Sequence, residues 1–111
     1  MGKPMRDATF LILAALADQE LHGYGIIGEV KALSGGRLVL GPGTLYGTLD
    51  RLTEQSLIRP TRTEVVDGRL RRYYGITSEG ISAVNSEADD RAATLRAATV
   101  RLKLGLRGAL A

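Results

Sequence analysis

The apolar residues in the first half of the chain repeat every three to four positions, which is the spacing of one helical face. The helices predicted from this spacing span residues 8–17, 23–34 and 45–56. Asp7 and Thr44 are the expected N-caps of the first and third helices, because their side chains can accept from free N–H groups. Ser34-Gly35-Gly36 is expected to end the second helix, since glycine adopts the left-handed cap conformation. The first helix is apolar on all sides, which indicates burial against its own domain and against a further surface.

Short segments connect these helices. Residues 18–22 are predicted to form a polar turn, and residues 37–40 a short extended segment. Gly41-Pro42-Gly43 then interrupts the pattern. Because no Gly-Lys-Ser/Thr follows it, we interpret it as a rigid turn that orients the third helix and not as a phosphate-binding loop.

A β-hairpin is predicted after the third helix. Asp67-Gly68 separates two β-like runs, 58–66 and 69–76, and this dipeptide favours a two-residue turn whose central residues both have positive φ. The expected cross-strand pairs are Val66 with Arg69, Val65 with Leu70 and Arg62 with Tyr73. Tyr73 and Tyr74 point to opposite faces of the second strand, so one is expected in the core and the other in solvent. Either assignment fits the alternation.

The last helix is predicted to begin after Thr77, a suitable N-cap, and to be long. A heptad seam recurs along it at Ile81, Ala88, Leu95 and Leu102, with Val84, Arg91 and Ala98 in the companion register. A helix of about 25 residues would be about 37 Å long, more than the three-helix body needs. The seam could pack on the first helix alone, but its excess length and the all-round apolarity of the first helix favour a homodimer.

The composition excludes several classes of protein. A chain of 111 residues with 44% hydrophobic and 24% charged residues is typical of one globular domain. The absence of cysteine excludes disulfides, cysteine-based zinc sites and thiol nucleophiles, and the single histidine, His22, argues against a catalytic triad or a histidine metal cluster. We therefore expect no enzyme activity, no metal and no cofactor. The longest apolar run, Phe10–Ala17, is too short to cross a bilayer, and no signal peptide is seen, so the expected location is the cytoplasm and no membrane partner is expected.

The segment Gly23-Tyr24-Gly25-Ile26-Ile27-Gly28 spells the Gly-x-Gly-x-x-Gly pattern of dinucleotide sites. Such a site needs a preceding strand and a βαβ unit, and the chain is too short for the corresponding sheet. We interpret Gly25 and Gly28 instead as positions where helices approach closely.

The net charge of +3 lies entirely in residues 59–75, where five arginines accompany Glu64 and Asp67. An arginine-rich hairpin could be a solvated face, but it follows directly on a helix that carries Thr, Tyr and Arg groups. Helix, helix, short extended segment, helix and hairpin is the order of a winged helix, whose third helix enters the DNA major groove while the hairpin contacts the backbone. Arginines at the hairpin would neutralise phosphates, and the helix would reach base edges.

Four segments carry a family resemblance. They are Leu21-His-Gly-Tyr-Gly-Ile, Gly43-Thr-Leu-Tyr-Gly-Thr-Leu-Asp-Arg-Leu, Leu57-Ile58, and Gly68-Arg-Leu-Arg-Arg-Tyr-Tyr-Gly-Ile-Thr-Ser-Glu-Gly80. Over about residues 8–100 the chain resembles the PadR-like transcriptional regulators. The resemblance implies a winged-helix homodimer joined by its C-terminal helix, usually a repressor and often released by a small molecule. Many members have proline where this chain has Gly47, and glycine where it has Ser56.

The predicted fold is mostly α with a small β-hairpin, a winged helix-turn-helix with a long C-terminal dimerisation helix. Residues 1–76 would form the DNA-binding domain, and residues 77–111 the dimerisation helix, which packs with the first helix in a single structural unit. The candidate DNA-binding residues are Tyr24, Thr44, Tyr46, Thr48, Arg51, Arg69, Arg71 and Arg72. The candidate dimerisation residues are Phe10, Leu13, Ile81, Val84, Ala88, Leu95 and Leu102.

The predicted function is that of a homodimeric, sequence-specific regulator of transcription that represses from a pseudo-palindromic operator in double-stranded DNA and is released by a small-molecule effector. The alternative is a protein-interaction or ligand-sensing module that has a winged-helix fold and does not bind DNA.

Overall fold

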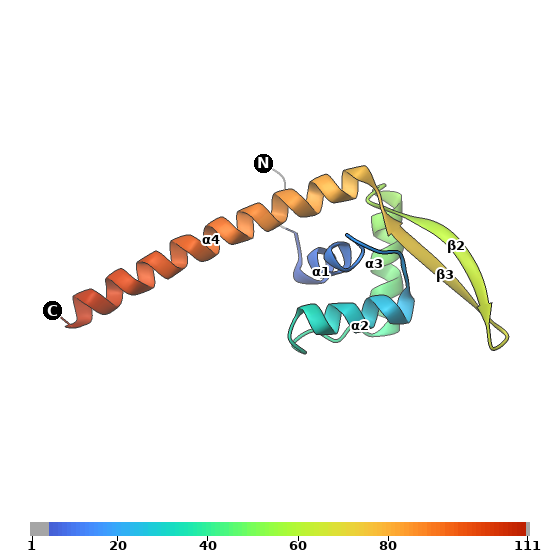
Figure 1. Cartoon of the computed structure of the whole chain (residues 1–111), viewed down its shortest axis with the longest axis horizontal. Coiled ribbons are helices and arrows are strands. Elements are labelled where there is room, and N and C mark those ends of the chain that lie inside the picture. The colour runs from blue at the N-terminus through green and yellow to red at the C-terminus, as the bar shows by residue number, and fades with distance from the viewer. Residues whose placement is uncertain (1–4, 111) are drawn as a thin grey trace.

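The computed structural model describes residues 5–110. Its elements, in chain order, are α1 (Asp7–Ala15), β1 (Leu21–His22), α2 (Gly23–Leu33), α3 (Pro42–Glu54), β2 (Ile58–Val66), β3 (Arg69–Ile76) and α4 (Ser78–Leu110). The first three helices form a compact body from which the hairpin and α4 extend in opposite directions (Figure 1). The molecule is elongated as a result, with principal extents of 67 × 29 × 22 Å. This architecture confirms the predicted winged helix with a long C-terminal helix.

The hydrophobic core lies where α1, α2 and α3 meet. Its fully buried side chains are Ile12, Leu13, Leu16, Ile26, Val30, Leu45, Leu49, Leu52 and Ile58. Burial of each such side chain contributes about 1.5–3 kcal/mol. The leucines of α3 at i, i+4 and i+7 form the predicted buried stripe, so the opposite side of α3 faces away from the body.

Two helices begin earlier than predicted, so their N-caps differ from the predicted ones. Arg6, not Asp7, is the N-cap of α1, and Asp7 lies in the first turn, where its charge suits the positive end of the helix. Gly41 is the N-cap of α3, and Pro42 occupies a first-turn position, which proline favours because no N–H is needed there. Thr44 is therefore inside the first turn of α3 and does not cap it.

Helices α2 and α3 end in the same backbone arrangement, a Schellman motif. After α2, the Gly36 N–H donates to the Lys31 carbonyl at 2.8 Å, and Gly35 has a φ of 63°. After α3, the Leu57 N–H donates to the Leu52 carbonyl at 3.0 Å, and the left-handed residue is Ser56, with a φ of 61°. A serine in this conformation costs about 1–2 kcal/mol relative to glycine, yet Ser56 adopts it and the helix-ending geometry is kept.

The sheet has three antiparallel strands in the order β1-β3-β2, one more than the predicted hairpin. The additional strand, β1, pairs with β3 and lies in the segment predicted as a turn. The predicted pairs of β2 with β3 are confirmed, and both turn residues, Asp67 and Gly68, have positive φ. Tyr74 is the buried tyrosine, and Tyr73 is half-buried.

The glycines of the Gly-x-Gly-x-x-Gly segment do not bring two helices together as predicted at Gly25 and Gly28. A Cβ at Gly28 would meet nothing within 4 Å, and one at Gly25 would meet the side chain of Leu21 at 3.3 Å. The tightest position of this segment is Gly23, where a Cβ would collide with the hydroxyl oxygen of Tyr46 on α3 and would displace that side chain. Gly23 therefore sets how Tyr46 lies across the start of α2.

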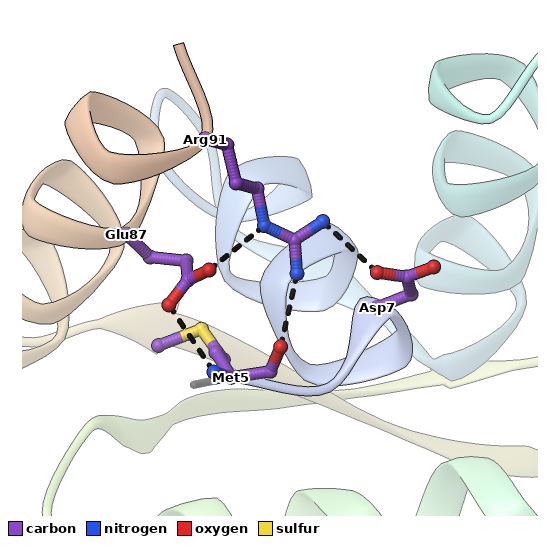
Figure 2. A network of polar contacts seen from close by, with 4 residues as sticks. All are labelled: Met5, Asp7, Glu87 and Arg91. Atoms are coloured by element: carbon purple, nitrogen blue, oxygen red, sulfur yellow. Dashed lines mark hydrogen bonds and ion pairs between the residues drawn. The ribbon is translucent and has the colours of Figure 1, made fainter. Parts of the chain in front are cut away.

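Helix α4 is anchored to the body at its first turns. Thr77 caps it as predicted, since its hydroxyl accepts from the Gly80 N–H at 3.0 Å, and Val84 packs into the core. Two turns further, Arg91 donates hydrogen bonds of 2.9 Å to the side chains of Glu87 and Asp7 and to the Met5 carbonyl (Figure 2).

This network joins α4 to the segment that precedes α1. The guanidinium of Arg91 also lies over the ring of Phe10, 4.2 Å from its centroid. The hydrogen bond from Arg91, with that from the Met5 N–H, lowers the pKa of Glu87. The arginine in the predicted heptad seam thus acts within the chain and fixes the direction in which α4 leaves the body.

The close packing at Gly80 leads to a stability prediction. A Cβ there would collide with the Leu57 carbonyl and press on Ile76, so we expect Gly80→Ala to lower the free energy of unfolding by about 1–3 kcal/mol. The control is Gly105→Ala in the same helix, where a Cβ meets nothing within 4 Å and alanine should stabilise by up to about 1 kcal/mol. Urea unfolding measures both, and equal stability of the two variants would contradict the packing role of Gly80.

Candidate nucleic-acid interface

Three elements enclose a groove on the side of the body opposite the core. The start of α2, the outer side of α3 and the hairpin, which we call the wing (residues 58–76), line a space of about 860 Å³. Its lining residues are His22, Gly23, Tyr24, Tyr46, Asp50, Val66, Asp67, Arg69, Leu70, Arg71, Arg72 and Tyr74. Five of the eight candidate DNA-binding residues lie here, because the fold brings the wing beside α3 although they are separate in sequence.

The candidates on α3 divide into two groups. Thr44 and Tyr46 are exposed on the flanks of the helix, and of the two only Tyr46 lines the groove. Thr48 is not available for base contacts, since it is only 8% exposed and its hydroxyl donates to the Thr44 carbonyl at 2.8 Å. The reason is helical periodicity, which places position 48 beside the buried Leu45 and Leu52.

Arg51 is exposed, but its guanidinium group is held by a contact within the chain, which the sequence did not predict. Its Nη2 donates to the hydroxyl of Thr9 on α1 at 2.9 Å. This contact joins residues 42 positions apart, so no local pattern in the sequence could reveal it. Arg51 links α3 to α1 in this structure, and a base contact would require the hydrogen bond to Thr9 to break.

Asp50 is a residue of this groove that the sequence reasoning missed. It is exposed and lies on the side of α3 opposite Leu45, Leu49 and Leu52. The signal was present in the helical spacing, because the residues furthest from the leucine stripe are Gly43, Gly47, Asp50 and Glu54. The prediction favoured Thr, Tyr and Arg, which can donate hydrogen bonds to DNA, and so passed over this acidic position.

The three candidate arginines of the wing all line the groove. Arg69 and Arg72 are exposed and Arg71 is half-buried. Within residues 5–110, none of the three takes part in an ion pair. Their charges are therefore available to an anionic partner.

Arg62, on the same hairpin, has a different environment. It pairs with Glu20 at 2.6 Å and with Glu64 at 2.9 Å, and its guanidinium stacks 3.7 Å from the centre of the Tyr73 ring. The hydrogen bonds to the two carboxylates raise the pKa of Arg62. Arg62 is thus balanced within the chain, whereas Arg59 of β2 and the three arginines of β3 form no ion pair among residues 5–110.

The start of α2 places Tyr24 at the rim of the groove, where it is exposed. The backbone here is set by His22, the N-cap, whose Nδ1 accepts from the Gly25 N–H at 3.3 Å. The His22 ring packs edge-on against Tyr73, with 5.3 Å between centroids. His22 thus has a capping and packing role, as expected for a residue at a helix start.

The candidate dimerisation residues also divide. Leu13 and Val84 lie in the chain's own core, so they are not available to a partner. Phe10 is half-buried beneath Arg91. The exposed candidates on α4 are Ile81, Ala88, Leu95 and Leu102. Three further apolar residues of this helix that the heptad pattern did not include are also exposed: Val100, Leu104 and Leu106.

Two absences hold for the described part of the chain. Across residues 5–110, no helix is long and apolar enough to cross a membrane. Within the same residues, no group of three or more His, Asp or Glu side chains is placed to hold a metal ion.

Comparison with known proteins identifies the family. The model of the transcriptional regulator PadR-like family matches residues 12–86, which include α2, α3, the wing and the first turns of α4. This chain belongs to the PadR-like family. Members of the PadR-like family are transcriptional regulators and not enzymes.

The curated relatives differ in length from one another. It is 41% identical over 76 residues to the transcriptional regulator Rv3488 of Mycobacterium tuberculosis, covering 68% of this chain and 67% of that protein. It is 43% identical over 86 residues to an uncharacterized 37.1 kDa protein of a Streptomyces fradiae transposon, covering 78% of this chain but only 23% of the other. The chain thus spans less than a quarter of one curated relative and about two thirds of another.

A solved structure adds a nucleic-acid complex. The crystal structure of Bacillus subtilis PadR in complex with operator DNA matches with a TM-score of 0.66 and 27% sequence identity. The match covers 77% of this chain and 48% of that one.

Proposed function

We propose that this PadR-like protein is a homodimeric, sequence-specific DNA-binding regulator that represses transcription from a pseudo-palindromic operator. The observation that carries the proposal is the groove lined both by α3 and by three arginines of β3 that form no ion pair among residues 5–110. An exposed helix beside a cationic hairpin suits a duplex, whose major groove admits a helix and whose backbone attracts arginine. In this proposal α3 is the recognition helix.

Each part of the interface has a distinct role. Thr44 and Tyr46 of α3 would contact base edges in the major groove, while Tyr24 at the start of α2 contacts the adjoining backbone. Arg69, Arg71 and Arg72 would neutralise phosphates and hold the protein in register. Arg51 stays a candidate only in a complex in which its contact with Thr9 is exchanged for one with DNA.

Dimerisation through α4 is proposed from its exposed apolar residues and its charge distribution. The first half of α4 carries Asp89 and Asp90, and the second half carries Arg96, Arg101, Lys103 and Arg107. Antiparallel pairing with α4 of a second copy would place opposite charges side by side and cover the exposed leucines. We assign residues 1–76 to the DNA-binding domain and residues 77–111 to the dimerisation helix, together forming one structural unit.

Repression and release by a small-molecule effector are proposed from the family resemblance. A regulator of this kind acts where the chromosome lies, so the proposal places the protein in the cytoplasm. The match to PadR from Bacillus subtilis, crystallised with operator DNA, supports DNA as the partner of this chain.

Fluorescence anisotropy tests the DNA-binding part of the proposal. Labelled duplexes from the protein's own promoter region and scrambled duplexes are titrated at about 50 and 200 mM salt. We expect specific binding about 10³-fold or more tighter than binding to scrambled DNA, with both affinities falling as salt rises. Absence of binding to either duplex at the lower salt would favour the alternative, a winged-helix interaction module that does not bind DNA.

A further inference from the structure

The outermost line of α3 carries few side chains. Gly43, Gly47, Asp50 and Glu54 lie furthest from the buried leucines, and a Cβ at either glycine would meet nothing within 4 Å. Asp50 is therefore the first side chain that a duplex approaching along this line would meet after the helix start. Glu54 lies one turn further on and does not line the groove.

Asp50 has an unusual electrostatic position for an interface that faces phosphates. It lines the same groove as Arg69, Arg71 and Arg72, and among residues 5–110 it forms no ion pair or side-chain hydrogen bond. A free carboxylate here repels the backbone of any DNA that enters, whatever its sequence. Tight binding to a preferred site therefore requires that the Asp50 carboxylate gain a contact with the DNA that offsets this repulsion.

The chemistry of DNA restricts that contact. An ionised carboxylate only accepts hydrogen bonds, and phosphates and deoxyribose oxygens donate none. The donors in the major groove are the amino groups of cytosine and adenine, and the side-chain pairing suited to aspartate is with the cytosine N4 amino group. One class of partner, a base amino group, therefore offsets the repulsion.

We propose that Asp50 is a specificity-determining residue that accepts a hydrogen bond from the N4 amino group of a cytosine in each half-site. This inference rests on the proposed function, in which α3 enters the major groove. Asp50 lowers affinity for sequences that lack the cytosine, because its charge is then left unpaired beside the backbone. Asp50 therefore contributes more to discrimination between DNA sequences than to affinity for DNA.

The test compares Asp50→Asn with the control Glu54→Gln. Each change removes one negative charge from the same side of α3 and keeps the side-chain size. Both variants should bind random duplexes more tightly than the wild type. Duplexes selected from a random pool by each purified protein then report base preference.

The selected sequences decide the outcome. We expect Asp50→Asn alone to lose the cytosine at one position of each half-site in favour of adenine, which asparagine contacts through N6 and N7. Discrimination at that position should change by about five- to 150-fold. The Glu54→Gln variant should select the wild-type sequence.

Two results would overturn the inference, and they are distinguishable. If Asp50→Asn selects the wild-type sequence at every position and differs only in affinity, Asp50 acts as a charge and reads no base. If the wild type itself selects no sequence, the proposed function fails and the inference fails with it. Circular dichroism spectra matching the wild type confirm that each variant is folded.

Discussion

Replacing Arg69, Arg71 and Arg72 together by alanine is expected to weaken binding to operator and random DNA by similar factors. The physical reason is that phosphates carry no sequence information, and all three arginines line the groove without an ion pair among residues 5–110. The plot of log affinity against log salt should also become shallower, by about 0.9 for each phosphate that the variant no longer neutralises. Anisotropy titrations over a series of salt concentrations measure both effects.

The matched control for the wing is Arg62→Gln. It also removes an arginine from the hairpin, but one whose charge is balanced by Glu20 and Glu64. We expect its salt dependence to stay close to that of the wild type. If the salt slope of the triple variant is unchanged, the wing arginines do not contact phosphates. If binding is weakened only for operator DNA, these arginines read bases.

Changing Leu95 or Leu102 to glutamate is expected to convert the proposed dimer to monomers. The two side chains are 68% and 69% exposed within the chain, so the change should spare the core and act on contact with a second copy. A carboxylate placed in a buried apolar seam is strongly unfavourable unless it is paired. Light scattering measures the mass, and thermal unfolding followed by circular dichroism checks that the body stays folded.

Disruption of the dimer should also reduce binding to the operator. A monomer engages one half-site, so it forgoes the gain from linking two binding units, about 10²–10⁴-fold. Ser86→Glu is the control, because it adds the same charge to an exposed position of α4 on the side opposite the heptad seam. If a variant at Leu95 or Leu102 stays dimeric, the heptad seam is not the dimer interface. The exposed apolar residues Val100 and Leu104 would then be the next candidates for that interface.

Helical spacing was sufficient to predict which residues of α3 in the candidate interface are exposed. The stripe Leu45, Leu49 and Leu52 indicated which side of α3 is buried, and Thr44 and Tyr46 are exposed as expected. The same spacing, applied strictly, would have placed Thr48 with the buried leucines. It would also have drawn attention to Asp50.

Other assignments depended on contacts between distant residues. Arg51 meets Thr9 across 42 positions, and Arg62 meets Glu20 across the same separation. Arg91 reaches Asp7 across 84 positions. No periodicity encodes such pairs, so the sequence did not reveal that Arg62 and Arg91 are neutralised within the chain while the arginines of β3 are not.

The sequence by itself determined the order of the four helices and the hairpin, the turn at Asp67-Gly68, the leucine stripe of α3 and the family. These follow from short-range patterns, because helix spacing, turn conformation and motif identity depend on residues close together in the chain. Only the tertiary structure decided that Tyr74 is the buried tyrosine, that Leu13 belongs to the core and that Asp50 shares a groove with the wing. Those features depend on how α3, the sheet and α4 pack, since burial and charge pairing are properties of surfaces that meet only in the fold.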